Sequence, residues 1–146
     1  MKTIFSLFCL VLVIFVVAVF LKNLKTETAT INNHTFKLYV AKTTKEKEVG
    51  LSEKTSLPED FGMLFVFEKP GFYSFWMKNM KFGIDIIYIN KDKIVTIYKN
   101  LLPQKSNKEA LLYKPEEPAD MVLEINAGLS QKYNLQKGDR VKIENL

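Results

Sequence analysis

The residues with the clearest chemical potential lie close together in the middle of the chain, at Trp76, Lys78, Asn79 and Asp85. Lys78 and Asn79 leave one predicted strand just before a tight connection, and Asp85 enters the next strand among isoleucines. A carboxylate that points into an apolar interior needs a partner, which Lys78 or Asn79 can supply. The sequence therefore predicts a polar contact between two neighbouring strands, beside an aromatic side chain.

Three interpretations of this cluster stay open. It is a buried structural pair with Trp76 filling the core, or the polar part of a small pocket with an aromatic wall, or a catalytic site in which Lys78 or Asp85 has a shifted pKa. The full set of candidate residues, for a pocket or for a structural polar cluster, is Trp76, Lys78, Asn79, Asp85, Met63 and Glu124.

Other kinds of catalytic site have little support. His34 is the only histidine and falls in a predicted hairpin, while Cys9 is the only cysteine and lies in an apolar run. Nucleophilic sites that pair Ser or Cys with His are therefore not supported, and we expect no metal and no cofactor. Carboxylate chemistry stays open as the alternative, because several acidic residues could converge in space: Glu68, Asp85, Asp120, Glu124 and Asp139.

The elements that would position these residues are mostly strands. Strands are predicted at 29–31, 35–40, 62–67, 72–77, 84–89, 94–98, 121–125 and around Val141 and Ile143. A helix is predicted to begin with a capping box at Thr43 and Glu46 and to end at Gly50, and a second short helix is predicted at 127–134. Tight turns are predicted at Asn32-Asn33 and at 69–72.

The central strands are apolar on both faces, so the sheet must be covered on both sides. We predict a mostly β fold: a small curled sheet or closed, barrel-like domain of about seven strands with two short helices. Helices long enough for the crossovers of a parallel α/β fold are absent from the pattern.

The N-terminus predicts a membrane segment. From Ile4 to Leu21 the residues are apolar except Ser6 and Cys9, and these 18 residues would span about 27 Å as a helix, close to the thickness of a hydrocarbon core. Large side chains close the run, which favours a retained anchor over a cleaved signal peptide. We expect residues 1–21 to cross the membrane, 22–29 to form a linker and 30–146 to fold as one domain.

The charge pattern limits the partners. The chain carries a net charge of +5, spread along its length, and Arg140 is its only arginine. Lysine replaces arginine poorly in bidentate phosphate recognition, so we expect no nucleic-acid binding. We predict a single-pass protein of the cytoplasmic membrane, bound to the bilayer through residues 4–21, with its domain outside the cytoplasm; secretion after cleavage is the alternative.

Four sequence blocks in order carry a family resemblance: Gly50-Leu51, 62–67, 75–80 running into 84–89, and 122–128 with Gly138-Asp139 beyond. The chain resembles the family known as domain of unknown function 192 over about residues 31–145. The resemblance implies a small barrel-like β fold, often exported or anchored, with no settled activity. Ser52 and Lys54 stand where the family usually has Met and Arg, and Gln104 stands where many members have Cys.

These observations favour a binding or accessory module that recognises a small molecule or an envelope partner. The alternative is a hydrolase or transferase that works with carboxylates and Lys78. A deep pocket that holds Lys78, Asp85 and another carboxylate would favour the enzyme, whereas a shallow groove or a bare sheet edge would favour the binding module.

Overall fold

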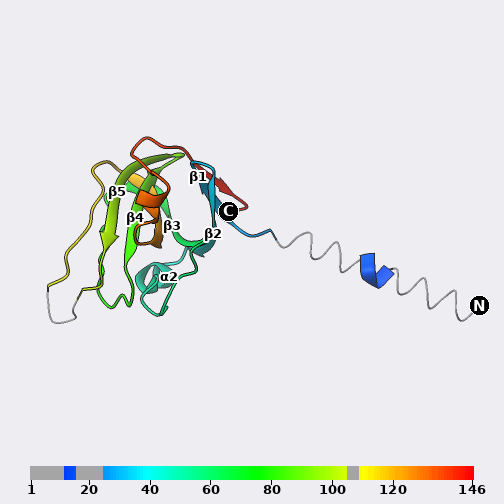
Figure 1. Ribbon diagram of the computed structural model, residues 1–146, viewed down its shortest axis with the longest axis horizontal. Helices are drawn as coiled ribbons and strands as arrows, with labels where there is room; N and C mark the ends of the chain where they lie inside the picture. Colours follow the sequence, from blue (N-terminus) through cyan, green and yellow to red (C-terminus); the bar gives the residue numbers. More distant parts are fainter. Residues whose placement is uncertain (1–11, 16–24, 105–108) are drawn as a thin grey trace, which may run out of the picture.

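The computed structural model describes residues 12–15, 25–104 and 109–146. Seven strands of the described residues form one sheet in the order β5-β4-β6-β3-β2-β1-β7 (Figure 1). The strands are β1 (Thr28–Ile31), β2 (His34–Ala41), β3 (Phe61–Gly71), β4 (Ile84–Asn90), β5 (Lys93–Leu101), β6 (Ala119–Asn126) and β7 (Val141–Glu144). The globular part also contains two short helices, α2 (Thr44–Val49) and α3 (Leu129–Lys132). The prediction of a mostly β domain with two short helices is confirmed.

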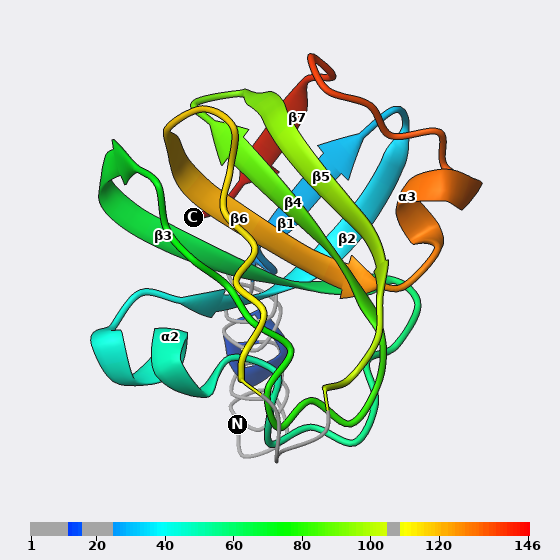
Figure 2. The same ribbon diagram turned by 90° about the vertical axis from the view of Figure 1, so that its left-hand side faces the viewer.

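The sheet is curled into a half-barrel (Figure 2). All of its strand pairs are antiparallel except β2 and β3, which run parallel and are connected through α2. An isolated bridge joins Lys93 of edge strand β5 to Arg140, next to the other edge strand β7. The curl therefore brings the two edges of the sheet toward each other at one corner.

Both faces of the sheet are buried, as the apolar strands predict. One cluster includes Leu123 and Ile125 of β6, and the other includes Val122 of the same strand. Successive side chains of a strand point to opposite faces, so Val122 and Glu124 share a face that Leu123 and Ile125 do not. Buried side chains on opposite faces therefore lie in different clusters and do not contact each other.

Two local predictions are confirmed. Asn32 and Asn33 have φ angles of 47° and 66°, which suit the tight hairpin between β1 and β2. At α2 the Thr43 hydroxyl accepts a hydrogen bond from the Glu46 N–H, and the Glu46 carboxylate accepts one from the Thr43 N–H. This capping box holds a helix too short to be stable alone.

The prediction of a strand at 72–77 is wrong. β3 continues to Gly71, and the following residues pass over the sheet with one isolated bridge, between Phe75 and Tyr113. Tyr73 stacks back on Phe67 at 3.6 Å between ring centroids, and Met77 is fully buried. The apolar residues of this segment are therefore used to cover one face of the sheet rather than to extend it.

The predicted membrane segment lies for the most part outside the described residues, which include only 12–15 of it, and these four are helical. Within the described ranges, no helix is both long enough and apolar enough to cross a membrane. Cys9 also lies outside the described residues. The predicted linker 22–29 ends inside β1, which begins at Thr28.

Candidate functional site

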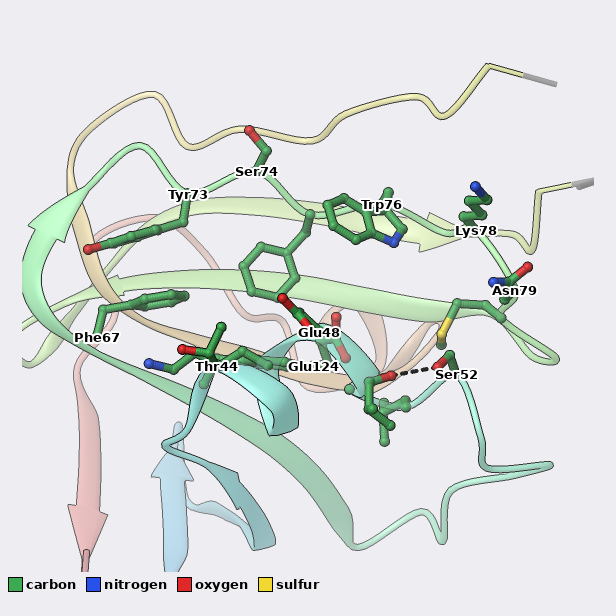
Figure 3. Close-up of a pocket in the computed structure, with 17 residues that line it drawn as sticks. Thr44, Glu48, Ser52, Phe67, Tyr73, Ser74, Trp76, Lys78, Asn79 and Glu124 are labelled. Atoms are coloured by element: carbon green, nitrogen blue, oxygen red, sulfur yellow. Dashed lines mark hydrogen bonds between the residues drawn. The ribbon is translucent and has the colours of Figure 1, made fainter.

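A cavity of about 610 Å³ lies on the face of the sheet that carries Val122 and Glu124. We call it the central pocket. Figure 3 shows α2 and the turn after it on one side, the segment after β3 on the other, and Glu124 between them. Its lining consists of Thr44, Lys47, Glu48, Val49, Gly50, Leu51 and Ser52; Phe65 and Phe67; Tyr73, Ser74, Phe75, Trp76, Lys78, Asn79 and Met80; and Glu124.

Glu124 lies at the buried end of the central pocket. Its neighbours across the sheet are Met63 on β3 and Ile86 on β4, and only 4% of its surface is exposed. Burial raises the pKa of the Glu124 carboxyl to about 8, because a charged carboxylate loses its hydration there. The carboxyl group is therefore mostly protonated at neutral pH.

The Glu124 carboxyl group has no hydrogen-bond or ion-pair partner in the part of the chain that the structure describes. Among the side-chain hydrogen bonds and ion pairs of the described residues, none involves the Glu124 carboxyl group. Burial is the only cause of its raised pKa, so no neighbouring cation offsets the effect. Buried polar groups are normally paired. Glu124 differs from the unpaired buried atoms Asn90 Oδ1 and Ser130 Oγ because it lines a cavity, where a ligand or water can reach its carboxyl group.

Aromatic side chains form much of the wall of the central pocket. Phe65 meets Phe75 edge to face at 4.9 Å between ring centroids, and Phe67 stacks on Tyr73. Trp76, the only tryptophan of the chain, is 47% exposed. The walls therefore offer apolar surface and ring faces around one acid.

Helix α2 brings its own side chains to the pocket because its two ends are fixed. Its start is held by the capping box, and Gly50 ends it with a φ of 49°, a conformation that favours glycine. A Cβ atom at Gly50 would also lie 3.2 Å from the ring of Phe65. Beyond it, the Ser52 hydroxyl donates a hydrogen bond of 2.6 Å to the Val49 carbonyl (Figure 3).

The opposite wall, residues 72–80, is fastened by contacts with the connection between β5 and β6. Phe75 and Tyr113 exchange two backbone hydrogen bonds of 2.9 and 2.8 Å, and the Gln104 N–H donates to the Met77 carbonyl at 3.2 Å. The buried Tyr88 hydroxyl donates to the carbonyls of Tyr73 and Tyr113. Asn79 lies in a turn with a φ of 62°.

The predicted contact of Asp85 with Lys78 or Asn79 is wrong. Asp85 is fully buried, but it pairs with Ile125 in the sheet and so points to the face opposite Glu124. Its carboxylate accepts hydrogen bonds from three backbone N–H groups, those of Asn100 (2.7 Å), Gly128 (3.0 Å) and Ser130 (2.8 Å). Asp85 thus ties the end of β5 to the start of α3.

The structure separates the remaining candidates. Trp76, Lys78, Asn79 and Glu124 all line the central pocket, while Met63 is buried beside Glu124 without lining the pocket. The carboxylates do not converge: Asp120 accepts from the Lys91 N–H, and Asp139 accepts from Asn32 and from the Gln136 N–H. Within the residues that the structure describes, no group of three or more His, Cys, Asp and Glu side chains could hold a metal ion.

His34 has a structural place at the start of β2. Its ring stacks on Tyr133 at 3.7 Å between ring centroids. A second, smaller cavity of about 250 Å³ lies beside it and is lined in part by Glu59 and Asp60. These two acids already form ion pairs, with Lys132 and Lys37 respectively, so this cavity has no unsatisfied group comparable to Glu124.

The comparison with protein families agrees with the resemblance of the four sequence blocks. Residues 26–143 match the model of DUF192, described as Uncharacterized ACR. The chain belongs to the DUF192 family. The description of the family gives no activity.

Solved structures share the fold of this DUF192 domain. A protein of unknown function from Novosphingobium aromaticivorans DSM 12444 is 30% identical with a TM-score of 0.72, covering 79% of this chain and 83% of that one. A proposed transcription regulator from Sinorhizobium meliloti 1021 is 27% identical with a TM-score of 0.75, covering 84% of this chain and 96% of that one. No curated protein matches the sequence.

Sequence reasoning missed most of the pocket wall. Phe65, Phe67 and Phe75 were assigned to strands with two apolar faces, and such residues are normally core. Lys47 and Glu48 fall in the predicted helix and were not singled out as candidates. The available signal was the aromatic-rich run after Pro70-Gly71, which is too rich in large side chains for a surface turn.

Proposed function

We propose that this DUF192 domain is a binding module that takes a small molecule into the central pocket. The observation that carries the proposal is the unpaired, buried Glu124 at the end of a cavity with aromatic walls. Ligand sites are typically concave, mostly apolar and equipped with a few polar groups that fix orientation. A volume of about 610 Å³ falls in the range of such sites.

An enzyme remains the second candidate because of one observation. A carboxyl group whose pKa is about 8 can exchange a proton near neutral pH, as a general acid or base must. Lys78 lines the same pocket, but the third group expected of such a site, Asp85, faces the other side of the sheet. The geometry therefore supports binding better than hydrolysis or group transfer.

We further propose that the domain is anchored in the cytoplasmic membrane by residues 4–21 and faces outside the cytoplasm, where an envelope protein is an alternative partner. The run of residues 4–21, apolar except for Ser6 and Cys9, supports the anchor. Fractionation of cells that produce the full chain, with a variant lacking residues 4–21 as the control, tests it. Recovery of the full chain in the soluble fraction would contradict the anchor.

The description of the Sinorhizobium relative as a proposed transcription regulator does not extend to this chain in our proposal. DNA recognition relies on arginines that contact phosphates and bases, and Arg140 is the only arginine here. It lies beside β7, away from the residues that line the central pocket.

A thermal-shift screen of the full chain against metabolites and cell-wall fragments tests the binding function, with Glu124→Gln and Phe75→Ala run in parallel. We expect a compound that raises the melting temperature of the wild type and has little effect on either variant. Equal shifts for all three proteins would place binding elsewhere. Consumption of the bound compound by the wild type but not by Glu124→Gln would instead favour the enzyme.

A further inference from the structure

We propose that the central pocket binds the cationic head of a small amine that carries a single positive charge, with its ammonium group against Glu124. This inference rests on the proposed binding function and adds the chemical class of the ligand. It applies equally to primary and quaternary amines, since both place a compact cation on the same acid and rings.

The first step of the argument is the missing partner of Glu124. Glu124 is 4% exposed, and it lines the central pocket. A buried carboxylate is stable when it is paired with a cation, and the described residues provide none within hydrogen-bond reach. An ammonium group in the pocket would supply the positive charge that Glu124 lacks as a partner.

The second step is the chemistry of the walls. Ring faces attract ammonium groups, and cages of aromatic side chains recognise quaternary amines. Phe67 already binds a cation of the protein itself, because the Lys47 ammonium lies 4.6 Å from its ring centroid. Phe65, Phe75 and Trp76 line the same cavity, and no lysine lies over their rings among the cation contacts of the described residues.

The third step limits the ligand to one positive charge. The charged groups that line the rest of the pocket are Lys47 and Glu48 of α2 and Lys78 of the opposite wall. Lys78 and Glu48 are exposed, Lys47 is half-buried, and together they leave the rim with one excess positive charge. A second cationic group at the rim would be repelled, whereas a neutral or acidic group would be accepted there.

Binding of a cation must displace the proton of Glu124. The other titratable groups on this side of the sheet are the charged groups of the pocket lining and four tyrosine hydroxyls, those of Tyr73, Tyr88, Tyr98 and Tyr113. Burial raises the pKa of Tyr88 further above its ordinary value. We therefore expect Glu124, the acid at the buried end of the pocket, to set the pH dependence. Affinity for a permanent cation should rise as the pH increases through the pKa of Glu124, which is about 8.

Trp76 gives a direct readout, because the only tryptophan of the chain lines the pocket. The full chain is titrated with tetramethylammonium, which has no proton to lose, and with n-butylammonium, 1-butanol and butanoate, following Trp76 fluorescence at pH 6 and pH 8. For one displaced proton and a pKa of about 8, we expect the affinity for tetramethylammonium to rise about 50-fold between these pH values.

Two variants separate Glu124 from the general charge of the domain. Glu124→Gln should lose at least tenfold in tetramethylammonium affinity at pH 8 and should lose the pH dependence. Glu68→Gln, which removes an exposed carboxylate outside the pocket lining, should change the affinity less than threefold and keep the pH dependence. Circular dichroism of both variants checks that the fold is retained.

The outcomes distinguish this inference from the function on which it rests. If 1-butanol or butanoate binds more tightly than the two ammonium probes, or if ammonium affinity falls with pH, the pocket binds small molecules but the cationic class is wrong. If no probe changes the fluorescence and the thermal-shift screen is also negative, the proposed binding function falls as well.

Discussion

Two buried carboxyl groups on neighbouring strands of this domain have opposite surroundings. Asp85 on β4 is fully buried and accepts three backbone hydrogen bonds, whereas Glu124 on β6 is 4% exposed and has no partner in the described part of the chain. They lie one residue apart in register, since Ile86 is the residue opposite Glu124. The alternation of the strands sends the two side chains to opposite faces.

The difference teaches how to separate structural from functional acids. Backbone N–H groups at the end of β5 and the start of α3 need hydrogen-bond acceptors, and the Asp85 carboxylate supplies them. Its charge therefore stabilises the fold. Glu124 faces a cavity and keeps a proton because nothing stabilises its charge. This contrast supports the proposal that Glu124 meets a ligand in the central pocket.

The largest expected effect is the pH dependence caused by Glu124. The folded protein holds this proton up to about pH 8, while the unfolded chain releases it near the ordinary pKa of 4.5, so the stability contributed by the proton is lost as pH rises between these values. From pH 5 to pH 8.5 the wild type should lose about 4 kcal/mol of unfolding free energy relative to Glu124→Gln. Urea unfolding followed by Trp76 fluorescence measures this difference.

A constant difference between the two proteins across this pH range would show that Glu124 is charged in the folded state. That result would remove the contrast with Asp85, because Glu124 would then have a partner or free access to water. It would also remove the proton that a bound cation is expected to displace.

The second effect concerns Asp85. Asp85→Asn places an NH₂ group where three N–H donors converge, and it removes the charge that strengthens their hydrogen bonds; we expect a loss of about 3 kcal/mol. Urea unfolding at pH 7 measures it. Asp120→Asn is the matched control, because Asp120 accepts one backbone hydrogen bond, from Lys91, and should cost about 1 kcal/mol or less. Equal costs for the two variants would contradict the structural role of Asp85.

Local signals made much of the fold predictable. The hairpin at Asn32-Asn33 and the capping box of Thr43 and Glu46 depend on residues within four positions of each other, and both were confirmed. Apolar residues on both faces of the central strands correctly predicted a sheet covered on both sides, because a strand that is buried on both faces carries apolar side chains on both.

The arrangement of the site was less predictable because it depends on distant contacts. The donors to Asp85 lie 15, 43 and 45 residues away along the chain, and they are backbone groups, which every residue carries. Trp76 and Phe75 have the composition of a strand, but a stacked Tyr73 turns their segment across the sheet. Glu124 was named as a candidate, yet only the structure shows that its carboxyl group has no partner among the described residues.

The smallest expected effect is that of Lys78→Ala on stability. It tests the buried contact between Asp85 and Lys78 that the sequence predicted and the structure does not show. Lys78 is exposed, and within the described residues no hydrogen bond or ion pair involves its ammonium group. Lys78→Ala should therefore change the unfolding free energy by about 0.5 kcal/mol or less, as urea unfolding at pH 7 would show. Loss of one partner of a buried pair would cost about 3–5 kcal/mol. A marked loss of stability in Lys78→Ala would mean that Lys78 is paired with a buried acid after all. Since Lys78 adds positive charge to the rim, the same variant should bind tetramethylammonium slightly more tightly.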